Sequence, residues 1–360
     1  MSNSKTVAIV GAGIVGMLAA ENFFSRGWQV VVFEKEKREY SAHCSRTAAG
    51  MIAPCSELEV AEGLIGRLGN LSLSLWDELM EKWALDVSYK RKGSIILTHP
   101  RDMEELYRFK KRVNYFDRSI GSFVDYEGLR EYEPNLPPVF QKGLFLKEEG
   151  QIDGIGFLRV LSEKLAEKGV AFHYECEVDE VLPNILRIGS QEESFSWVID
   201  CRGLGGRKDL KELRGVRGEI IKVYTEEVNF SRPIRLLHPR FPIYIVPQED
   251  NHYLIGATLI ESESNLSITV RSALELLSSA HCVHPGFSEA NIVETSVGLR
   301  PAFFDNLPKI ICESGKISVN GLYRHGFLLS PILSKWVVDY CENKKIPFYQ
   351  SIFQELTCKL

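Results

Sequence analysis

The stretch Val7-Ala-Ile-Val10-Gly11-Ala-Gly13-Ile-Val-Gly16, followed by Val30-Val-Val-Phe33-Glu34, decides the fold of this chain. A short apolar strand runs into a glycine turn of the pattern GxGxxG, which is typical of a βαβ unit that binds a dinucleotide. Gly11 permits the tight turn, Gly13 lets the backbone approach a pyrophosphate, and Gly16 lets the following helix pack on the sheet. The phosphates are then expected at the N-terminus of that helix.

The surroundings of the motif distinguish it from an ordinary strand-to-helix turn. A helix is expected over 17–26, a turn at Gly27, and a second strand over 30–33 that ends in Glu34. An acid at this spacing accepts hydrogen bonds from a ribose 2′-hydroxyl and disfavours the 2′-phosphate of NADP. The motif alone leaves NAD and FAD as alternatives.

The composition is that of a soluble globular protein, with 44% hydrophobic and 25% charged residues in a chain of 360. This length predicts two domains, or one domain with a large insertion. The net charge of −5 gives no general attraction to nucleic acid or to anionic membranes.

Targeting signals are not evident in the sequence. No apolar run approaches the roughly 18 residues of a membrane span, and the N-terminus lacks the apolar core of a signal peptide. The eight cysteines are scattered without a CxxC pair, which favours free thiols in a reducing compartment over a zinc cluster. We therefore expect a cytoplasmic protein without a metal site.

The rest of the chain alternates between the cofactor fold and a sheet of another kind. Apolar residues at helical spacing predict a helix over 70–85, and Asp153 is placed to cap a helix that runs to about Lys168. Strands of the cofactor fold are expected at 170–174, 197–200 and 317–320, followed by a loop over 321–329 and a helix over 331–342. An antiparallel sheet is expected from strands at 219–224, 243–246, 253–256 and 292–297, with a helix at 269–281 among them.

These elements predict an α/β protein in which a Rossmann-like FAD-binding domain is interleaved with an α+β substrate domain built on a mostly antiparallel sheet. The cofactor domain is assigned to 1–88, 142–214 and 298–360, and the substrate domain to 89–141 and 215–297. Cofactor-fold segments at both ends of a chain, separated by sheet segments, are the feature that indicates a flavoprotein.

Two further stretches carry residues suited to a flavin and an acidic ligand. The run Ser45-Arg-Thr-Ala-Ala-Gly50-Met51 has small side chains that let a backbone lie against a flat ring. The stretches 298–301 and 320–331 combine Arg300 and Arg324 with glycine turns at strand ends. The planar guanidinium of Arg300 is suited to bind a carboxylate through two hydrogen bonds, and a structural ion pair is the alternative for either arginine.

With these motifs the chain resembles the D-amino-acid oxidase superfamily of flavoenzymes, most closely its glycine oxidase branch of thiamine biosynthesis. The resemblance covers nearly the whole chain. It rests also on Ala53-Pro54, Asp200-Cys-Arg-Gly203, Tyr244-Ile-Val-Pro247, Gly256-Ala-Thr258 and Tyr323-Arg-His-Gly326. Arg202 departs from the pattern, since the family more often has a small residue there, and so do Pro242 and Leu259, where relatives vary.

The resemblance implies FAD held without a covalent link. The residues that it places around FAD are Gly11, Gly13, Ile14, Val15, Gly16, Glu34, Lys35, Arg46, Thr47, Ala48, Gly50, Met51, Val178, Cys201, Gly203, Arg324, His325, Gly326, Phe327, Leu328 and Leu329. It also places Arg324 and the Tyr244 hydroxyl beside Arg300 in the substrate pocket.

The same resemblance implies the oxidation of glycine or a similar small amino acid. A hydride passes from the substrate Cα to flavin N5, and O2 then yields hydrogen peroxide. Positioning carries most of the rate in such a reaction, which needs no strong side-chain base. The product imino acid would serve the thiazole branch of thiamine biosynthesis. Relatives are often homo-oligomers, and no nucleic acid partner is implied.

Three alternatives remain open at this point, and a fourth, the NAD-dependent dehydrogenase, is rejected. A D-amino-acid dehydrogenase or oxidase would act on larger D-amino or N-substituted amino acids and use an acceptor other than oxygen. A tRNA-modifying flavoenzyme would need a basic face, against which the net charge of −5 argues. A flavin-binding protein without turnover would have no need of Arg300, Arg324 and Tyr244 together. An NAD-dependent dehydrogenase lacks a plausible catalytic acid.

Overall fold

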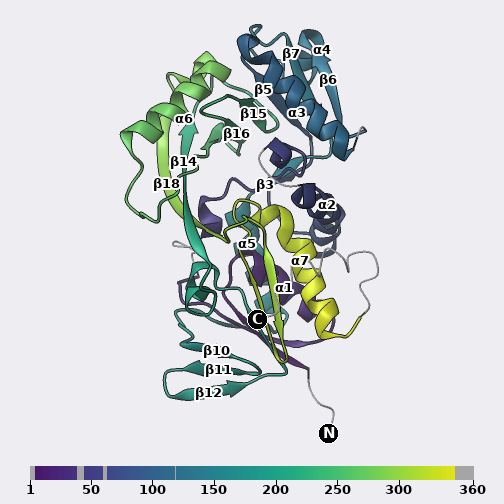
Figure 1. Ribbon diagram of the computed structural model, residues 1–360, viewed down its shortest axis with the longest axis vertical. Helices are drawn as coiled ribbons and strands as arrows, with labels where there is room; N and C mark the ends of the chain where they lie inside the picture. The colour runs from purple at the N-terminus through teal and green to yellow at the C-terminus, as the bar shows by residue number, and fades with distance from the viewer. Residues whose placement is uncertain (1–4, 39–43, 60–62, 118, 345–360) are drawn as a thin grey trace.

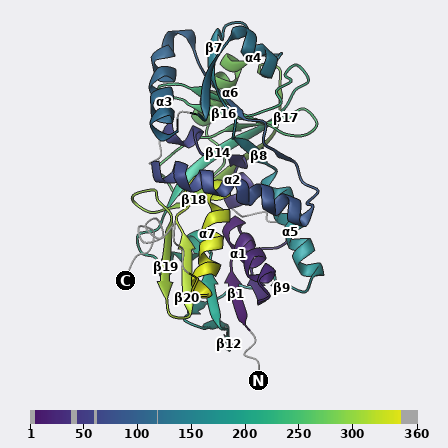
Figure 2. The ribbon, with the colours of Figure 1, turned by 90° about the vertical axis from the view of Figure 1, so that its right-hand side faces the viewer.

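The computed structural model describes residues 5–38, 44–59, 63–117 and 119–344. Two sheets lie at opposite ends of the long axis, and the helix α2 (Gly63–Trp83) crosses between them (Figures 1 and 2). Within the described residues, no helix is long and apolar enough to cross a membrane.

The first sheet has six strands and carries the glycine turn. Its order is β19-β20-β13-β1-β2-β9, and all neighbours pair in parallel except β19 with β20. Its strands are β1 (Thr6–Val10), β2 (Gln29–Phe33), β9 (Ala171–His173), β13 (Trp197–Asp200), β19 (Lys309–Glu313) and β20 (Lys316–Asn320). The helices packed with it are α1 (Ile14–Ser25), α5 (Gly154–Glu167) and α7 (Gly326–Cys341). Asp153 caps α5, as expected, by accepting from the Gly156 amide.

The loop predicted over 321–329 is wrong in its second half, because α7 already begins at Gly326. The sequence places Pro331 at the start of the helix, whereas the structure has it inside. Proline cannot donate to the carbonyl four residues earlier, which belongs to Phe327. That carbonyl instead accepts from Trp76 Nε1 of α2 at 2.9 Å and so still has a donor.

The second sheet has eight strands in the order β18-β14-β17-β16-β15-β5-β7-β6, and only β15 with β5 pairs in parallel. Its strands are β5 (Ser94–Thr98), β6 (Gly121–Asp125), β7 (Lys142–Leu146), β14 (Arg214–Tyr224), β15 (Ile234–Leu237), β16 (Ile243–Pro247), β17 (His252–Gly256) and β18 (Asn291–Ala302). The helices beside it are α3 (Met103–Phe116), α4 (Tyr126–Tyr132) and α6 (Val270–Val283).

Smaller elements complete the described chain. One three-stranded sheet consists of β3 (Met51–Ile52), β8 (Gly150–Ile152) and β4 (Tyr89–Lys90), and another of β10 (Glu180–Leu182), β11 (Ile185–Ile188) and β12 (Gln191–Ser194). Short 3₁₀ turns lie at Cys44–Thr47, Ser56–Glu59, Pro100–Asp102, Gly203–Lys208 and Pro285–Phe287.

The predicted fold class is confirmed: a parallel Rossmann-like sheet is joined to a largely antiparallel one. The domain bounds remain a proposal, and strand pairing moves one of them. The proposed bound at 142 would assign β7 to the cofactor domain, but β7 pairs with β5 and β6 in the second sheet. A division that follows the sheets therefore groups 142–146 with 89–141.

Candidate functional site

A cavity of about 920 Å³ lies between the two sheets and is lined by residues of both. It runs from the glycine turn after β1, past the segment 47–51, to Tyr244 on β16 and Arg300 on β18. Its volume is at the upper end of the range for small-molecule and cofactor pockets. The cavity thus joins the predicted cofactor residues to the predicted substrate residues.

The glycine turn has the shape that a pyrophosphate needs. Gly11 has a φ of +100°, which favours glycine, and a Cβ on Gly16 would lie 1.8 Å from the Gly11 carbonyl oxygen. At Gly13, by contrast, a Cβ would meet only Ser45 Oγ, at 3.7 Å. Gly13 is the N-cap of α1 and faces the cavity, so an anion bound there would meet the amides of the first helical turn. These residues fit a dinucleotide.

Glu34 braces this turn from the end of β2. Its Oε2 accepts from the Ala12 amide at 2.7 Å and its Oε1 accepts from the Glu36 amide at 2.9 Å. The carboxylate is buried and lines the cavity near Lys35 and Val178. This location is compatible with contact to a ribose, which stays a proposal.

The segment 47–51 is fixed where it passes the cavity. Gly50 has a φ of +65°, and a Cβ there would lie 1.9 Å from the Ile152 carbonyl oxygen. A Cβ on Gly298 of β18 would lie 2.0 Å from Thr47 Oγ1. Larger residues at Gly50 and Gly298 would therefore displace the segment from the cavity wall.

Most of the residues proposed from the sequence reach the cavity. Those that line it are Gly11, Gly13, Ile14, Val15, Glu34, Lys35, Thr47, Ala48, Gly50, Met51, Val178, Cys201, Gly203, Gly326, Phe327, Tyr244, Arg300 and Arg324. Those that do not are Gly16, Arg46, His325, Leu328 and Leu329. Arg46 instead pairs with Glu294 at 3.0 Å, and both of these side chains are about 40% exposed.

Arg300 extends from β18 across the neighbouring strand β14. Its guanidinium packs over Gly218 of β14. A Cβ on Gly218 would lie only 2.2 Å from the guanidinium. Its Nη1 donates to the carbonyls of Thr258, at 3.1 Å, and Arg217, at 3.4 Å. Within the described chain Arg300 forms no ion pair with a carboxylate, so the structural ion pair considered above does not occupy it.

Tyr244 lies on β16, with its hydroxyl 3.0 Å from where a Cβ on Gly256 would be. Burial raises the pKa of Tyr244, although the positive charges of Arg300 and Arg324 oppose the shift. The phenol is therefore neutral near pH 7 and can donate a hydrogen bond into the cavity.

Glu57 is a cavity residue that sequence reasoning missed. Its Oε2 lies 3.1 Å from Arg324 Nε and 3.3 Å from His325 Nδ1. Burial by itself would raise the pKa of Glu57, but the surrounding cations, with Arg324 the strongest, lower it below its ordinary value. Arg324 thus forms the ion pair that was the alternative to substrate binding in the sequence analysis, and it also lines the cavity.

Arg202, the departure noted in the sequence, has a structural explanation. Its Nη2 donates to Asp200 Oδ2 at 2.8 Å and also contacts Asp209. The guanidinium thus joins the end of β13 to the 3₁₀ turn that follows it. Among the described residues, no group of three or more His, Cys, Asp or Glu side chains is placed to hold a metal ion.

The lowered pKa of the buried His325 predicts how the stability of the protein depends on pH. Burial lowers the pKa of His325 to about 4, from an ordinary value near 6.5. Between these values the unfolded chain binds the proton more readily, so stability falls as pH falls, by at most about 1.4 kcal/mol per pH unit from this group. We expect the Tm to drop from pH 7 to pH 5, and to drop less in His325→Asn, which puts a residue favoured at helix N-caps at the N-cap position of α7.

The control for this experiment is His99→Gln, because His99 is exposed. That variant should show the full drop in Tm. If His325→Asn also showed the full drop, His325 would not be the group responsible.

Comparisons with known proteins agree with this geometry. The family model described as FAD dependent oxidoreductase matches residues 6–340. A Rhizobium etli protein with the provisional name thiamine biosynthesis oxidoreductase ThiO is 37% identical over 91% of this chain and 94% of its own. Glycine oxidase of Geobacillus kaustophilus is 28% identical over 97% of this chain and 96% of its own. The crystal structure of glycine oxidase from that organism superposes with a TM-score of 0.83, at 25% identity, over 98% of each chain.

Proposed function

The chain belongs to the family of FAD-dependent oxidoreductases, and from this premise we propose that it oxidises glycine or a similarly small amino acid, with O2 as the electron acceptor. The products would be the imino acid and hydrogen peroxide. The similarity to ThiO supports a place in supplying the thiazole of thiamine. A cytoplasmic location and a homo-oligomer remain part of this proposal.

The position of Arg300 at the cavity is the observation on which the proposal rests. Its guanidinium borders the cavity and has backbone carbonyls as its hydrogen-bond acceptors, whereas Arg324 already has Glu57. The charge of Arg300 is therefore suited to an anionic ligand in the cavity. A carboxylate forms two parallel hydrogen bonds with a guanidinium, which fixes both position and orientation.

Tyr244 and Arg324 complete the proposed substrate pocket. The neutral Tyr244 phenol can donate to the same carboxylate, and the ion pair of Arg324 with Glu57 also lines the cavity. When bound, FAD supplies a flavin N5 that accepts a hydride from the substrate Cα. The protein's contribution is to hold the substrate in line for that transfer, and such positioning alone accounts for several orders of magnitude in rate.

The cofactor is proposed to be held without a covalent link. The glycine turn and the amides at the start of α1 would bind the pyrophosphate, and Glu34 the ribose. Denaturation of the holoprotein should therefore release all of the flavin into solution.

The experiment that tests the function mixes the purified holoprotein with glycine in the absence of air. Loss of the flavin absorbance, its return on admitting air, and release of peroxide are the expected results. Persistence of the yellow spectrum would contradict glycine as substrate. Reduction by larger D-amino or N-substituted amino acids, without reoxidation by air, would support the dehydrogenase alternative instead.

Gly218→Ala is expected to impair catalysis without unfolding the protein. The added Cβ would lie within 2.2 Å of the Arg300 guanidinium, which is the movable end of a side chain. Displacement of a substrate-positioning group by about 1 Å costs on the order of 100-fold in rate. We expect kcat/KM to fall by about this factor, with little change in Tm.

Gly63→Ala is the matched control, because a Cβ there meets nothing within 4 Å. Its kinetics should equal those of the unmodified enzyme. Unchanged kinetics in Gly218→Ala would mean that Arg300 does not position the substrate from the place where it lies here.

A further inference from the structure

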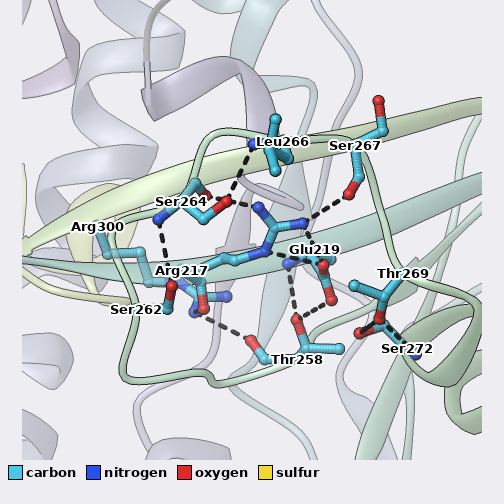
Figure 3. A network of polar contacts seen from close by, with 10 residues as sticks. All are labelled: Arg217, Glu219, Thr258, Ser262, Ser264, Leu266, Ser267, Thr269, Ser272 and Arg300. Atoms are coloured by element: carbon cyan, nitrogen blue, oxygen red, sulfur yellow. Dashed lines mark hydrogen bonds and ion pairs between the residues drawn. The ribbon is translucent and has the colours of Figure 1, made fainter.

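A buried ion pair lies on β14 beside Arg300 (Figure 3). The guanidinium of Arg217 donates to Glu219 Oε1 from Nε at 2.9 Å and from Nη2 at 2.6 Å. The two residues stand two positions apart and therefore share one face of the strand, whereas Gly218 between them belongs to the face against Arg300. Their side chains are 4% and 0% exposed, so this pair is shielded from water.

Glu219 also fixes Thr258, which follows β17. Thr258 Oγ1 donates to Glu219 Oε2 at 2.9 Å and accepts from the Glu219 amide at 3.0 Å. The Thr258 amide donates to the Glu219 carbonyl at 3.3 Å. Three hydrogen bonds thus hold Thr258 in one orientation relative to β14.

The two acceptors of Arg300 belong to the two residues that Glu219 holds. Arg300 Nη1 donates to the carbonyls of Thr258 and Arg217, and the side chains of both residues bond to the Glu219 carboxylate. Figure 3 shows Arg300 and Thr258 joined below the Arg217–Glu219 pair. Glu219 is therefore linked through side chains to both residues whose carbonyls accept from Arg300.

We propose that Glu219 is a positioning residue, which through Arg217 and Thr258 fixes the Arg300 guanidinium and so sets the affinity for the substrate carboxylate. This proposal rests on the proposed function in one respect, namely that Arg300 binds the carboxylate of the substrate. Glu219 does not line the cavity and contacts no reacting atom.

A purely stabilising role does not account for this arrangement well. A buried ion pair gives back little of the free energy spent in removing two charges from water, and apolar residues of similar size often serve stability equally. Arg217 also donates to the carbonyls of Ser264, at 2.6 Å, and Ser267, at 2.9 Å. These bonds hold the segment that contributes Leu259, Ile260 and Asn265 to the cavity wall. Arg217 thus also holds a segment that forms part of the cavity wall.

The ionised state of Glu219 agrees with this role. Burial opposes ionisation, but hydrogen bonds from Ser272, Arg217 and Thr258 lower the pKa of Glu219 below its ordinary value. Replacement by glutamine keeps the shape of the side chain and removes its charge. The Arg217 guanidinium would then lack its anion, and the Thr258 hydroxyl would lose a charged acceptor.

The experiment uses the FAD-loaded full chain and glycolate, which is glycine with a hydroxyl in place of the amine. Binding of glycolate is followed through the perturbation of the flavin absorbance, and kcat and KM are measured separately with glycine. In Glu219→Gln we expect the Kd of glycolate and the KM of glycine to rise together, by tenfold or more. We expect kcat to change by less than threefold.

The matched control is Glu133→Gln. Glu133 is also buried and accepts from an arginine, Arg232, at 3.0 Å, but neither residue lines the cavity. This variant should bind glycolate as the unmodified protein does. Equal weakening in Glu219→Gln and Glu133→Gln would overturn the proposal, because it would show a general effect of removing a buried charge.

Thr258 supplies a second and milder test, which also decides the matter if Glu219→Gln fails to fold. Thr258→Val removes the hydroxyl bonded to Glu219 and should weaken glycolate binding, and Thr258→Ser should restore most of the affinity. Unchanged affinity in Glu219→Gln or in Thr258→Val would overturn the proposal, as would a failure of the unmodified holoprotein to bind glycolate. If glycine is not oxidised but glycolate binding still weakens in these variants, the proposed function fails and the positioning role stands.

Discussion

Arg300→Ala is expected to give a folded, yellow protein whose kcat/KM for glycine is lower by roughly 10²- to 10⁴-fold. The variant loses two charge-assisted hydrogen bonds to the substrate carboxylate, each contributing about 1.5–3 kcal/mol, and about 1.4 kcal/mol corresponds to a factor of ten in rate. The fold should persist because Arg300 donates only to the carbonyls of Arg217 and Thr258 within the described chain. Flavin content and steady-state kinetics, measured on the same preparation, check both parts.

Two further variants sharpen this experiment. Arg300→Lys keeps the charge but loses the planar pair of donors, so its kcat/KM should lie between those of Arg300→Ala and the unmodified enzyme. Arg187→Ala removes an arginine of β11 that pairs with Glu180 and Glu192 on the surface, and should leave the kinetics unchanged. Equal activity in Arg300→Ala and the unmodified enzyme would show that another group binds the carboxylate.

The cofactor half of the site could be predicted from the sequence because its chemistry is local. The glycine turn places Gly11, Gly13 and Gly16 within six residues. Gly11 has a φ of +100°, and Gly16 lies too close to the Gly11 carbonyl for a side chain, so both requirements arise inside the motif. A Cβ on Gly16 would clash with the carbonyl of Gly11, another residue of the same motif. Glu34 could be placed for the same reason, since the end of β2 lies next to the end of β1 in a parallel sheet.

Glu57 could not be predicted, because its role depends on how distant segments meet. It lies in a short 3₁₀ turn without periodicity, and its partners Arg324 and His325 are more than 260 residues away in the chain. No spacing rule connects the turn to the start of α7. These groups meet because α2 packs both against α7 and against the 3₁₀ turn Ser56–Glu59.

The burial of the Arg217–Glu219 pair could not be predicted from the sequence for a different reason. Two charged residues at alternate positions of a strand ordinarily indicate an exposed face, yet both are buried here. The segment after β17 covers them and supplies the carbonyls of Ser264 and Ser267 to Arg217. The start of α7 also depends on a distant residue. Trp76 of α2 donates to the Phe327 carbonyl, which Pro331 leaves without a backbone donor, and the helix begins at Gly326 rather than at Pro331.

Gly16→Ala and Gly13→Ala are expected to fail in opposite ways, although they lie three residues apart in one motif. A Cβ on Gly16 would lie 1.8 Å from the backbone oxygen of Gly11, so α1 would have to move away from β1. Such overpacking costs about 1–3 kcal/mol. We expect the protein without FAD to have a lower Tm, and little flavin to remain bound after purification.

In Gly13→Ala the nearest protein atom to the new Cβ is Ser45 Oγ at 3.7 Å, an ordinary contact. The protein without FAD should therefore keep its Tm. The methyl group would nevertheless occupy the approach to the α1 N-terminus, where the pyrophosphate is expected, so the Kd for FAD should rise by on the order of tenfold or more, about 1.4 kcal/mol. Titration of both apoproteins with FAD, together with their Tm values, separates the two effects. An unchanged Kd in Gly13→Ala would place the pyrophosphate elsewhere in the cavity, because nothing in the protein itself opposes a methyl group at that position.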